Sequence, residues 1–348
     1  MNLISQAELG RVESCLATLL PKSTESHGLE FFVESIRSFV LAGGKRIRPQ
    51  LCLWTFAHTG GPLALAPAAM KIACAWELFH AFLLIHDDLI DDADSRRDQP
   101  SLHRRFEEQG GLCDKTGRDL AVVAGDLLFS AALDTLHDID LSPALYRREL
   151  RLFSRVALTT GLGQALDIVQ AGKPVARACE KTLLREYHWK TAAYTFEGPM
   201  LSGAVLAGAD EDILSVLSCY ALALGQAYQL QNDLFDLASP AHEGCDLVQG
   251  KRTVTLLRAR SAMNQGDRRR LDEILEELPN ANGQAVALAE ELRRNLLRSG
   301  APQQTQALID QFLAEARQAS RAGCLPRPLA TGLGELLDSL ESQYFTPV

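Results

Sequence analysis

Apolar residues recur at steps of three and four along most of this sequence, as at Phe32, Val33, Ile36 and Val40. This spacing places them on one face of an α-helix, where they can pack against a core. No segment shows a convincing alternation of apolar and polar residues, the pattern of a half-buried β-strand. The sequence therefore predicts an all-α protein.

The composition agrees with a folded helical chain. Hydrophobic residues make up 47% of the 348 residues, which is ample for a core, and they are mostly Leu and Ala, which favour helix. The breaks between helical patterns, such as Gly43-Gly44 and Ser239-Pro240, are short and none resembles a long linker. We expect a single domain over residues 1–348, with a helical tail after about residue 260.

Charge and cysteine usage exclude several classes of protein. The formal net charge of -9 argues against non-specific binding of nucleic acid. The eight cysteines show no CxxC pair and no zinc or disulfide spacing, so they are expected to be reduced. The N-terminus lacks the pattern of a signal peptide, and no stretch reaches 18 apolar residues. We expect a cytoplasmic protein without an integral membrane segment.

A cluster of aspartates follows a long apolar run. A helix turns by ~100° per residue, so Asp87, Asp88 and Asp91 share one face. Crowded carboxylates raise one another's pKa and call for cations, and their hard oxygens suit magnesium bridged to phosphates. The flanking His86 and Asp92 are candidates to support such ligands. A solvated acidic surface is the alternative interpretation of an isolated motif of this kind.

Cationic residues lie on both sides of this cluster. Arg96 and Arg97 follow it, and guanidinium groups are planar, permanently charged donors for phosphate oxygens. Upstream, Lys45, Arg46 and Arg48 lie at an expected junction of loop and helix, where free backbone N–H groups also favour an anion. Ordinary surface charge is the alternative here.

A second acidic cluster lies far along the chain. Gln229, Asp233 and Asp236 occupy one helical face at i, i+4 and i+7. Lys251 follows beyond a loop, and Lys190 lies in another expected helix. Taken alone, Lys190 is better interpreted as an exposed lysine than as a ligand clamp.

The order of these blocks resembles the trans-isoprenyl diphosphate synthases, the polyprenyl synthetase family that includes farnesyl and geranylgeranyl diphosphate synthases. The resemblance covers about residues 43–255 and consists of GGKRIRP, ELFHAFLLIHDDLIDDADSRRDQPSLH, GQALD, Lys190-Thr191, GQAYQLQNDLFD and DLVQGKRT. It implies the isoprenoid synthase fold, a bundle of antiparallel helices around a central active-site cavity, and a homodimer. It also implies three Mg²⁺ ions as cofactors.

The resemblance assigns roles residue by residue. It implies metal ligands at Asp87, Asp88, Asp91, Asp233 and Asp236. It implies allylic diphosphate contacts at Arg96, Lys190, Thr191, Gln229 and Lys251. The diphosphate of isopentenyl diphosphate would be held by Lys45, Arg48, His80 and Arg97. The residues most directly involved in catalysis would be Asp87, Asp88, Asp91, Arg96, Lys190 and Asp233. Gln164 and Asp167 are similar to a family pair near the reaction centre.

The implied activity is a magnesium-dependent prenyltransferase that condenses an allylic diphosphate with isopentenyl diphosphate. In the family, side chains one turn before the first acidic motif limit product length, and here these are Phe82 and Leu83. A bulky Phe82 indicates a farnesyl or geranylgeranyl product. We expect Phe82→Ala to lengthen it.

The sequence departs from the family in its second motif. Asn232 stands where an aspartate is usual, and the short loop from Leu237 to Asp246 lacks one lysine. A working but tuned elongating enzyme is our interpretation. Two alternatives stay open: a terpene-synthase-like lyase or cyclase on the same fold, and a weakly active partner subunit of a prenyl synthase. The retained isopentenyl diphosphate residues favour the elongating enzyme.

Overall fold

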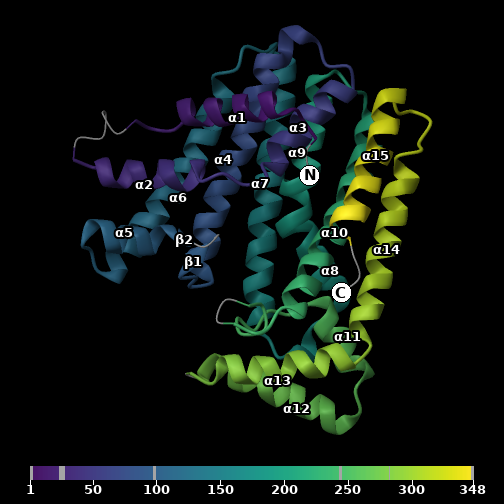
Figure 1. The fold of residues 1–348 in the computed structure, drawn as a ribbon. Helices are drawn as coiled ribbons and strands as arrows, with labels where there is room; N and C mark the ends of the chain where they lie inside the picture. Colours follow the sequence, from purple (N-terminus) through teal and green to yellow (C-terminus); the bar gives the residue numbers. More distant parts are fainter. Residues whose placement is uncertain (1–2, 23–27, 97–98, 243–244, 282, 346–348) are drawn as a thin grey trace. The chain divides into compact units, whose positions relative to one another are not determined.

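The computed structural model describes residues 3–22, 28–96, 99–242, 245–281 and 283–345. The predicted all-α class is confirmed, because helices account for nearly all of the regular structure in these residues (Figure 1). Their strands are β1 (Ser95–Arg96) and β2 (Gln99–Pro100), an antiparallel pair with Ser95 opposite Pro100. Strands of two residues are too short to give an alternating pattern, so the sequence did not predict them.

The chain divides into two compact units. Unit 1 contains Met1–Leu152 and Pro199–Ala209, and unit 2 contains Phe153–Gly198 and Asp210–Val348. The first boundary falls inside helix α7 (Pro143–Ala171). The expected single domain stays a prediction, and each unit is described by itself below.

Unit 1 is built around the apolar helix α4. Its elements are α1 (Gln6–Leu19), α2 (Glu30–Leu41), α3 (Ile47–His58), η2 (Leu63–Leu65), α4 (Ala66–Ile90), β1, β2, α5 (Leu102–Gly110), α6 (Asp114–His137), the first part of α7, and most of α9 (Gly198–Leu206). Helices α1, α3 and α6 pack against α4 (Figure 1). Ile72 to Phe79 are all buried, so the middle of α4 lies in the core. Its carboxyl end carries the first acidic motif.

A buried arginine marks the junction between α2 and α3. Gly43 and Gly44 have positive φ angles and separate the two helices, as the sequence predicted. Arg46 then adopts the left-handed conformation with φ of 44°. Its guanidinium donates to both carboxylate oxygens of Glu13 at 2.7 and 2.9 Å and to Glu77 at 2.8 Å. Arg46 is therefore a structural residue in the core of unit 1 rather than surface charge.

Unit 2 is organised around the long helix α10. Its elements are the rest of α7, η3 (Val175–Arg177), α8 (Glu180–Glu186), η4 (Tyr187–Glu197), α10 (Glu211–Ala238), α11 (Val254–Ala262), α12 (Gln265–Glu277), η5 (Leu278–Asn280), α13 (Ala285–Arg298), α14 (Ala301–Ala319) and α15 (Arg327–Gln343). Helix α10 packs against η4 and α14. Leu271, Ile274 and Leu292 belong to an apolar cluster that joins α12 and α13 to α11. This arrangement agrees with the expected helical tail.

Two glycines allow close packing around η4, which is a π-helix. A Cβ at Gly163 of α7 would lie 2.3 Å from the backbone nitrogen of Lys190. A Cβ at Gly225 of α10 would lie 2.3 Å from the Cβ of Ala192. Both distances are too short for a real side chain, so the backbones of α7 and α10 approach η4 as only glycine permits. Lys190 is held between them.

Three helical stretches are long and apolar enough to cross a membrane by length and composition: Leu63–Ile90, Asp114–His137 and Glu211–Ala238. The expectation that no integral membrane segment occurs rested on unbroken apolar runs. Averaged over 18 residues, these helices are apolar enough even though occasional polar residues interrupt their apolar runs. The absence of a membrane segment therefore stays a prediction.

Candidate active site

The first acidic motif forms the carboxyl end of α4. Asp87 and Asp88 lie in its last turn, and Asp91 is the C-cap residue. The Asp88 side chain is 1% exposed, and Arg96 Nε donates to its two oxygens at 2.7 and 2.9 Å. Burial raises the pKa of Asp88 in spite of Arg96. Because the carboxyl end of a helix also carries partial negative charge, this motif favours additional cations.

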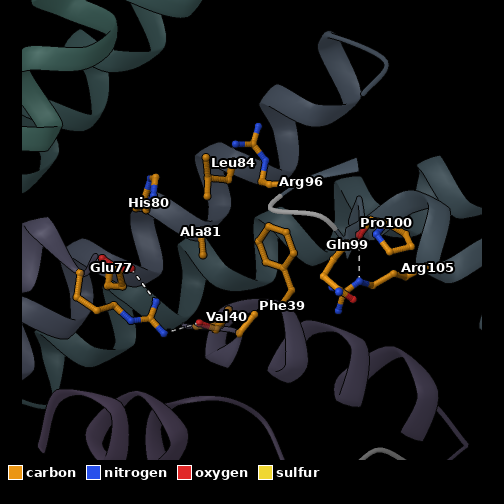
Figure 2. A pocket seen from close by; sticks show the side chains of 12 residues that line it. Phe39, Val40, Glu77, His80, Ala81, Leu84, Arg96, Gln99, Pro100 and Arg105 are labelled. Atoms are coloured by element: carbon orange, nitrogen blue, oxygen red, sulfur yellow. Dashed lines mark hydrogen bonds and ion pairs between the residues drawn. The ribbon is translucent and has the colours of Figure 1, made fainter. Parts of the chain in front are cut away.

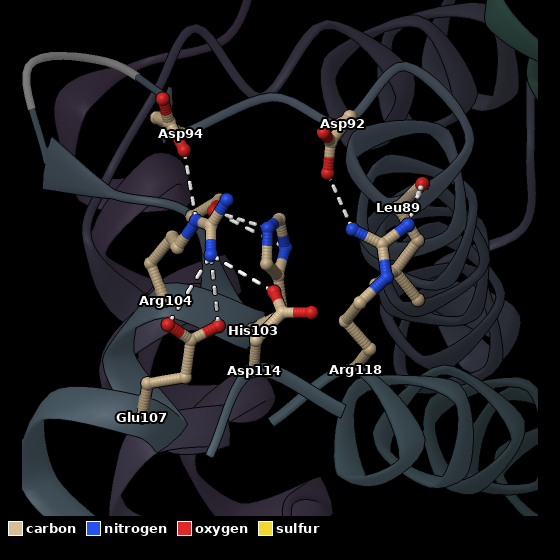
Figure 3. A network of polar contacts seen from close by, with 9 residues as sticks. Leu89, Asp92, Asp94, His103, Arg104, Glu107, Asp114 and Arg118 are labelled. Carbon is tan, nitrogen blue, oxygen red and sulfur yellow. Dashed lines mark hydrogen bonds and ion pairs between the residues drawn. The ribbon is translucent and has the colours of Figure 1, made fainter. Parts of the chain in front are cut away.

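The two residues that flank the motif are tied to α6. His86 Nε2 lies 3.3 Å from the Val122 carbonyl oxygen. Arg118 forms an ion pair with Asp92 and donates to the Leu89 carbonyl at 2.9 Å (Figure 3). Asp92 has a positive φ of 49°, so the chain turns sharply where this ion pair holds it. Both residues thus connect the motif to α6, and their support of metal ligands stays a prediction.

The segment after the motif is held by Arg104. Its guanidinium contacts Asp94 at 2.8 Å, Glu107 at 3.1 Å and Asp114 at 3.0 Å (Figure 3). These contacts join the start of the hairpin to α5 and α6. Arg97, the predicted partner of isopentenyl diphosphate, lies outside the described residues.

A charged cavity lies beside the motif in unit 1. Its lining includes His80, Arg96, Arg105 and the Arg46–Glu77 ion pair (Figure 2). The structure therefore brings two predicted site residues, His80 and Arg96, into one cavity. Lys45 is exposed and Arg48 is buried in the first turn of α3; neither is among the described residues that line it.

Phe82 belongs to an aromatic cluster in unit 1. Its ring centroid lies 5.7 Å from Phe79, 5.3 Å from Phe129 of α6 and 4.7 Å from His86. Phe129 carries no recognisable motif, so the sequence did not single it out. The cluster adds the ring of Phe129 from α6 to that of Phe82, which lies about one turn before the acidic motif.

A second polar cavity lies within unit 2. It gathers many of the predicted residues and several others: Asp167, Glu186, Tyr187, Lys190, Thr191, Gln229, Asp233, Asp246, Lys251, Arg252 and Thr253. Two of its cations contact carboxylates. Lys190 pairs with Asp167, and the Lys251 Nζ atom lies 3.3 Å from Asp246. The cavity thus has the mixed charge expected where both a cation and an anion bind.

Asp233 is the most constrained carboxylate of this cavity. Thr191 donates to Gln229 Oε1 at 3.0 Å, and Gln229 Nε2 donates to Asp233 Oδ1 at 2.9 Å. Tyr187 Oη donates to the other oxygen, Asp233 Oδ2. Burial, together with the charge of Asp246, raises the pKa of Asp233 to about 8. Asp236 accepts from the backbone nitrogen of Asp246 at 3.1 Å and is not among the described residues that line the cavity.

Sequence reasoning missed Glu186 and Tyr187. Glu186 is 5% exposed, and burial followed by repulsion from Asp167 raises its pKa to about 8. Both residues line the cavity at the junction of α8 and the π-helix η4, which left no trace in the apolar periodicity. Their closeness to Lys190 in the sequence was the one available signal.

Asn232, the departure in the second motif, contacts the end of the chain. Tyr344, directly after α15, donates its hydroxyl to Asn232 Oδ1. The Tyr344 ring stacks on Tyr228 with centroids 4.9 Å apart and meets Phe235 edge-on. The Asn232 amide oxygen, which stands where the family has a carboxylate oxygen, therefore accepts a hydrogen bond from Tyr344.

The described residues contain no ready-made group of three Asp, Glu, His or Cys side chains that could hold a metal. Magnesium is usually held by one or two carboxylates, with water and substrate phosphates completing its shell. The paired aspartates of α4 and the carboxylates of α10 fit that mode of binding.

Comparison with known proteins decides the family. The polyprenyl synthetase family profile matches residues 30–292. The chain belongs to the polyprenyl synthetase family.

Relatives of this polyprenyl synthetase cover most of its length. It is 33% identical over 273 residues to geranylgeranyl pyrophosphate synthase 11, chloroplastic, of Arabidopsis thaliana, covering 74% of this chain and 72% of that one. It is 30% identical over 255 residues to geranylgeranyl diphosphate synthase of Methanosarcina mazei, covering 71% and 72%. The crystal structure of the Corynebacterium glutamicum geranylgeranyl pyrophosphate synthase, complexed with isoprenyl diphosphate and magnesium, matches with a TM-score of 0.79 at 25% identity, covering 97% and 99%. The predicted family and its isoprenoid synthase fold are confirmed.

Proposed function

We propose that this polyprenyl synthetase is a short-chain prenyltransferase that condenses an allylic diphosphate with isopentenyl diphosphate. The observation that carries the proposal is the unit 2 cavity, in which Lys190, Thr191, Gln229, Asp233 and Lys251 lie together. Cations and hydroxyl donors beside a buried carboxylate suit a diphosphate accompanied by a divalent ion. The relatives named geranylgeranyl diphosphate synthase support the short-chain class.

The metal is proposed to be magnesium, with three ions in the full complex. Asp87, Asp88 and Asp91 would hold it on α4, and Asp233 and Asp236 on α10. Burial and neighbouring carboxylates raise the pKa values of Asp88 and Asp233, so their ionised forms are unfavourable alone and would be stabilised by a nearby cation. When bound, magnesium would neutralise charge on the departing diphosphate.

Two different sets of side chains would bind the two diphosphates. Arg96, Lys190, Thr191, Gln229 and Lys251 would bind the allylic diphosphate and stabilise it as a leaving group. Residues proposed to hold isopentenyl diphosphate are Lys45, Arg48, His80 and Arg97. The allylic carbon–oxygen bond breaks, and its electron pair leaves with the diphosphate. The double bond of isopentenyl diphosphate attacks the allylic cation, and the released diphosphate accepts the proton that is lost.

The assay that tests this function uses purified protein, magnesium, isopentenyl diphosphate and a series of allylic diphosphates. Products are analysed with and without phosphatase treatment. We expect diphosphates that form only when isopentenyl diphosphate is present. Products formed without it would contradict an elongating enzyme and indicate a terpene-synthase-like lyase. Activity that appears only with an added homologue would indicate a partner subunit.

The lyase is the second candidate because of Asn232. A neutral residue in the second motif lowers its charge, and the neighbouring loop has lost a lysine. The Tyr344 hydroxyl donates to Asn232 Oδ1, so this oxygen already has a hydrogen-bond partner and is a poorer metal ligand. His80, in the charged cavity beside Arg96, favours the elongating enzyme because a lyase needs no second diphosphate site.

We further propose a homodimer located in the cytoplasm. Apolar residues are exposed on α6, with Val122 at 46% and Val123 at 54%, and on α7, with Leu158 at 72% and Leu162 at 59%. Exposed apolar stripes of this kind are typical of protein interfaces. In Leu63–Ile90, 67% of the apolar window is buried, which favours a core helix over a membrane span.

The proposed dimer interface can be tested by placing charges on the exposed apolar residues of α7. A Leu158→Glu and Leu162→Glu double variant places two charges on the exposed stripe of α7, and it should sediment as a monomer in analytical ultracentrifugation. The matched control carries Arg151→Glu, an exposed residue of the same helix. A double variant with the wild-type sedimentation coefficient would contradict the interface.

A further inference from the structure

The hydroxyl of Tyr187 connects three segments of unit 2. Tyr187 begins η4 and is 5% exposed. Its Oη atom donates to Asp233 Oδ2 on α10. The same atom accepts from the backbone nitrogen of Val254, the first residue of α11, at 3.3 Å. One buried atom therefore links Asp233 to the segment that begins with Lys251.

The direction of these hydrogen bonds is fixed by the number of donors. A phenol has one proton, and the Val254 N–H already occupies a lone pair of Oη. The proton consequently points at Asp233.

Both oxygens of Asp233 are oriented by protein donors. Gln229 holds Oδ1 at 2.9 Å, and Tyr187 holds Oδ2. Each carboxylate oxygen has a second lone pair, which stays available to a ligand. The carboxylate is thus set in one orientation before a cation arrives, which reduces the ordering cost of binding.

We propose that Tyr187 is a positioning residue that orients Asp233 for a divalent cation at the unit 2 cavity. This inference rests on the proposed function, because that function requires a cation there. It concerns a residue outside the six blocks on which the family resemblance stands. Hydrogen-bond partners of metal ligands commonly change metal affinity by ~10- to 100-fold when removed.

Tyr187→Phe tests the role because it deletes one oxygen and keeps the ring. Binding of Mn²⁺ in the presence of inorganic diphosphate is measured by the electron paramagnetic resonance signal of free Mn²⁺. We expect the dissociation constant to rise by ~10-fold or more. The matched control is Tyr220→Phe, since Tyr220 is equally buried in unit 2 and donates to the Leu333 carbonyl at 2.9 Å. A folded Tyr187→Phe protein with the affinity of wild type overturns the proposal.

A double-mutant cycle separates positioning from general stability. If Tyr187 acts through Asp233, Tyr187→Phe adds no further loss of Mn²⁺ affinity in an Asp233→Asn background. An additive loss would overturn the proposal. Both measurements are independent of turnover: weaker Mn²⁺ binding in Tyr187→Phe supports the positioning role even where the prenyltransferase assay fails.

If Tyr187→Phe does not fold, the proposal can be tested with a labelled tyrosine that retains the hydroxyl. With 3-fluorotyrosine incorporated at position 187, the ¹⁹F resonance should shift as Mg²⁺ and inorganic diphosphate are added. The same label at position 220 should stay unchanged. A resonance at 187 that does not respond to saturating Mg²⁺ overturns the proposal.

Discussion

Arg46 combines two features that rarely occur together at one residue. Its backbone lies in the left-handed region, which is unfavourable for a residue with a Cβ, and its side chain is 3% exposed. The ion pairs with Glu13 and Glu77 compensate for the burial of the charge. The sequence showed a run of cations at this point, and only the fold distinguishes the buried Arg46 from the exposed Lys45.

Removal of this arginine should destabilise the protein strongly. In Arg46→Met, Glu77 becomes a buried charge without its partner, which typically costs ~3–5 kcal/mol. We expect the free energy of unfolding in urea to fall by about that amount. Arg11→Met, at an arginine whose side chain is 69% exposed, should change it little. Equal stabilities for the two variants would contradict the structural role of Arg46.

Asn232 offers a second test at a single position. Asn232→Asp supplies the carboxylate that the motif lacks and can still accept from Tyr344. A carboxylate is a stronger magnesium ligand than a neutral amide, so we expect a lower magnesium requirement. Combination with Tyr344→Phe releases the new carboxylate and should lower the requirement further. An unchanged requirement in both variants would mean that position 232 lies outside the metal shell.

Helices α4 and α6 form a pair whose aromatic residues meet on one side. Phe82 and Phe129 come from different helices, and their ring centroids are 5.3 Å apart. The sequence predicted chain-length control by Phe82 and Leu83; the Phe82–Phe129 pair would make a broader barrier than Phe82 alone. Their contact depends on the close packing of α6 at Gly125, where a Cβ would lie 2.3 Å from His86.

Phe82→Ala should lengthen the product by at least one isoprene unit, because it opens the aromatic barrier. Phe129→Ala should act in the same direction. Products are separated by chain length after dephosphorylation. Phe31→Ala serves as the control, since Phe31 packs edge-on against Phe106 of α5 in the same unit. A product of unchanged length in both Phe82→Ala and Phe129→Ala would exclude this cluster from chain-length control.

At the scale of the molecule, the sequence was most informative about local order. Periodicity predicted the helices. The motifs singled out part of the lining of the unit 2 cavity, namely Lys190, Thr191, Gln229, Asp233 and Lys251. Contacts between distant positions left no such pattern. The pairs Arg46–Glu77, Tyr187–Asp233 and Asn232–Tyr344 join different helices, so their sequence neighbours give no indication of them. The π-helix was hidden for a related reason, because its period differs from that of the α-helix.

Buried acids should make the stability of the whole chain depend on pH. Glu149 is fully buried in unit 1, and burial raises its pKa to about 8. Its stabilising protonated form is lost in the folded state as pH rises through about 8, whereas the unfolded residue ionises near ~4.3. Stability should therefore decline across that window, by at most ~1.4 kcal/mol per pH unit from this group.

Glu149→Gln should flatten this decline, because the amide cannot ionise. The measurement is the melting temperature without metal, at several values between pH 5 and about 8.5, the interval in which the group titrates. Glu315→Gln, at an exposed carboxylate of α14, should keep the wild-type slope. A Glu149→Gln protein with that same slope would contradict the burial of a protonated acid.

The contact between Tyr344 and Asn232 also has a practical consequence for handling the protein. The last helix ends one residue before the hydroxyl that reaches into the second motif. Tyr344 therefore belongs to the surroundings of the residues on α10 that are proposed to bind metal. Truncated versions of this chain should retain Tyr344, because its removal would abolish the hydrogen bond to Asn232 and the stacking on Tyr228.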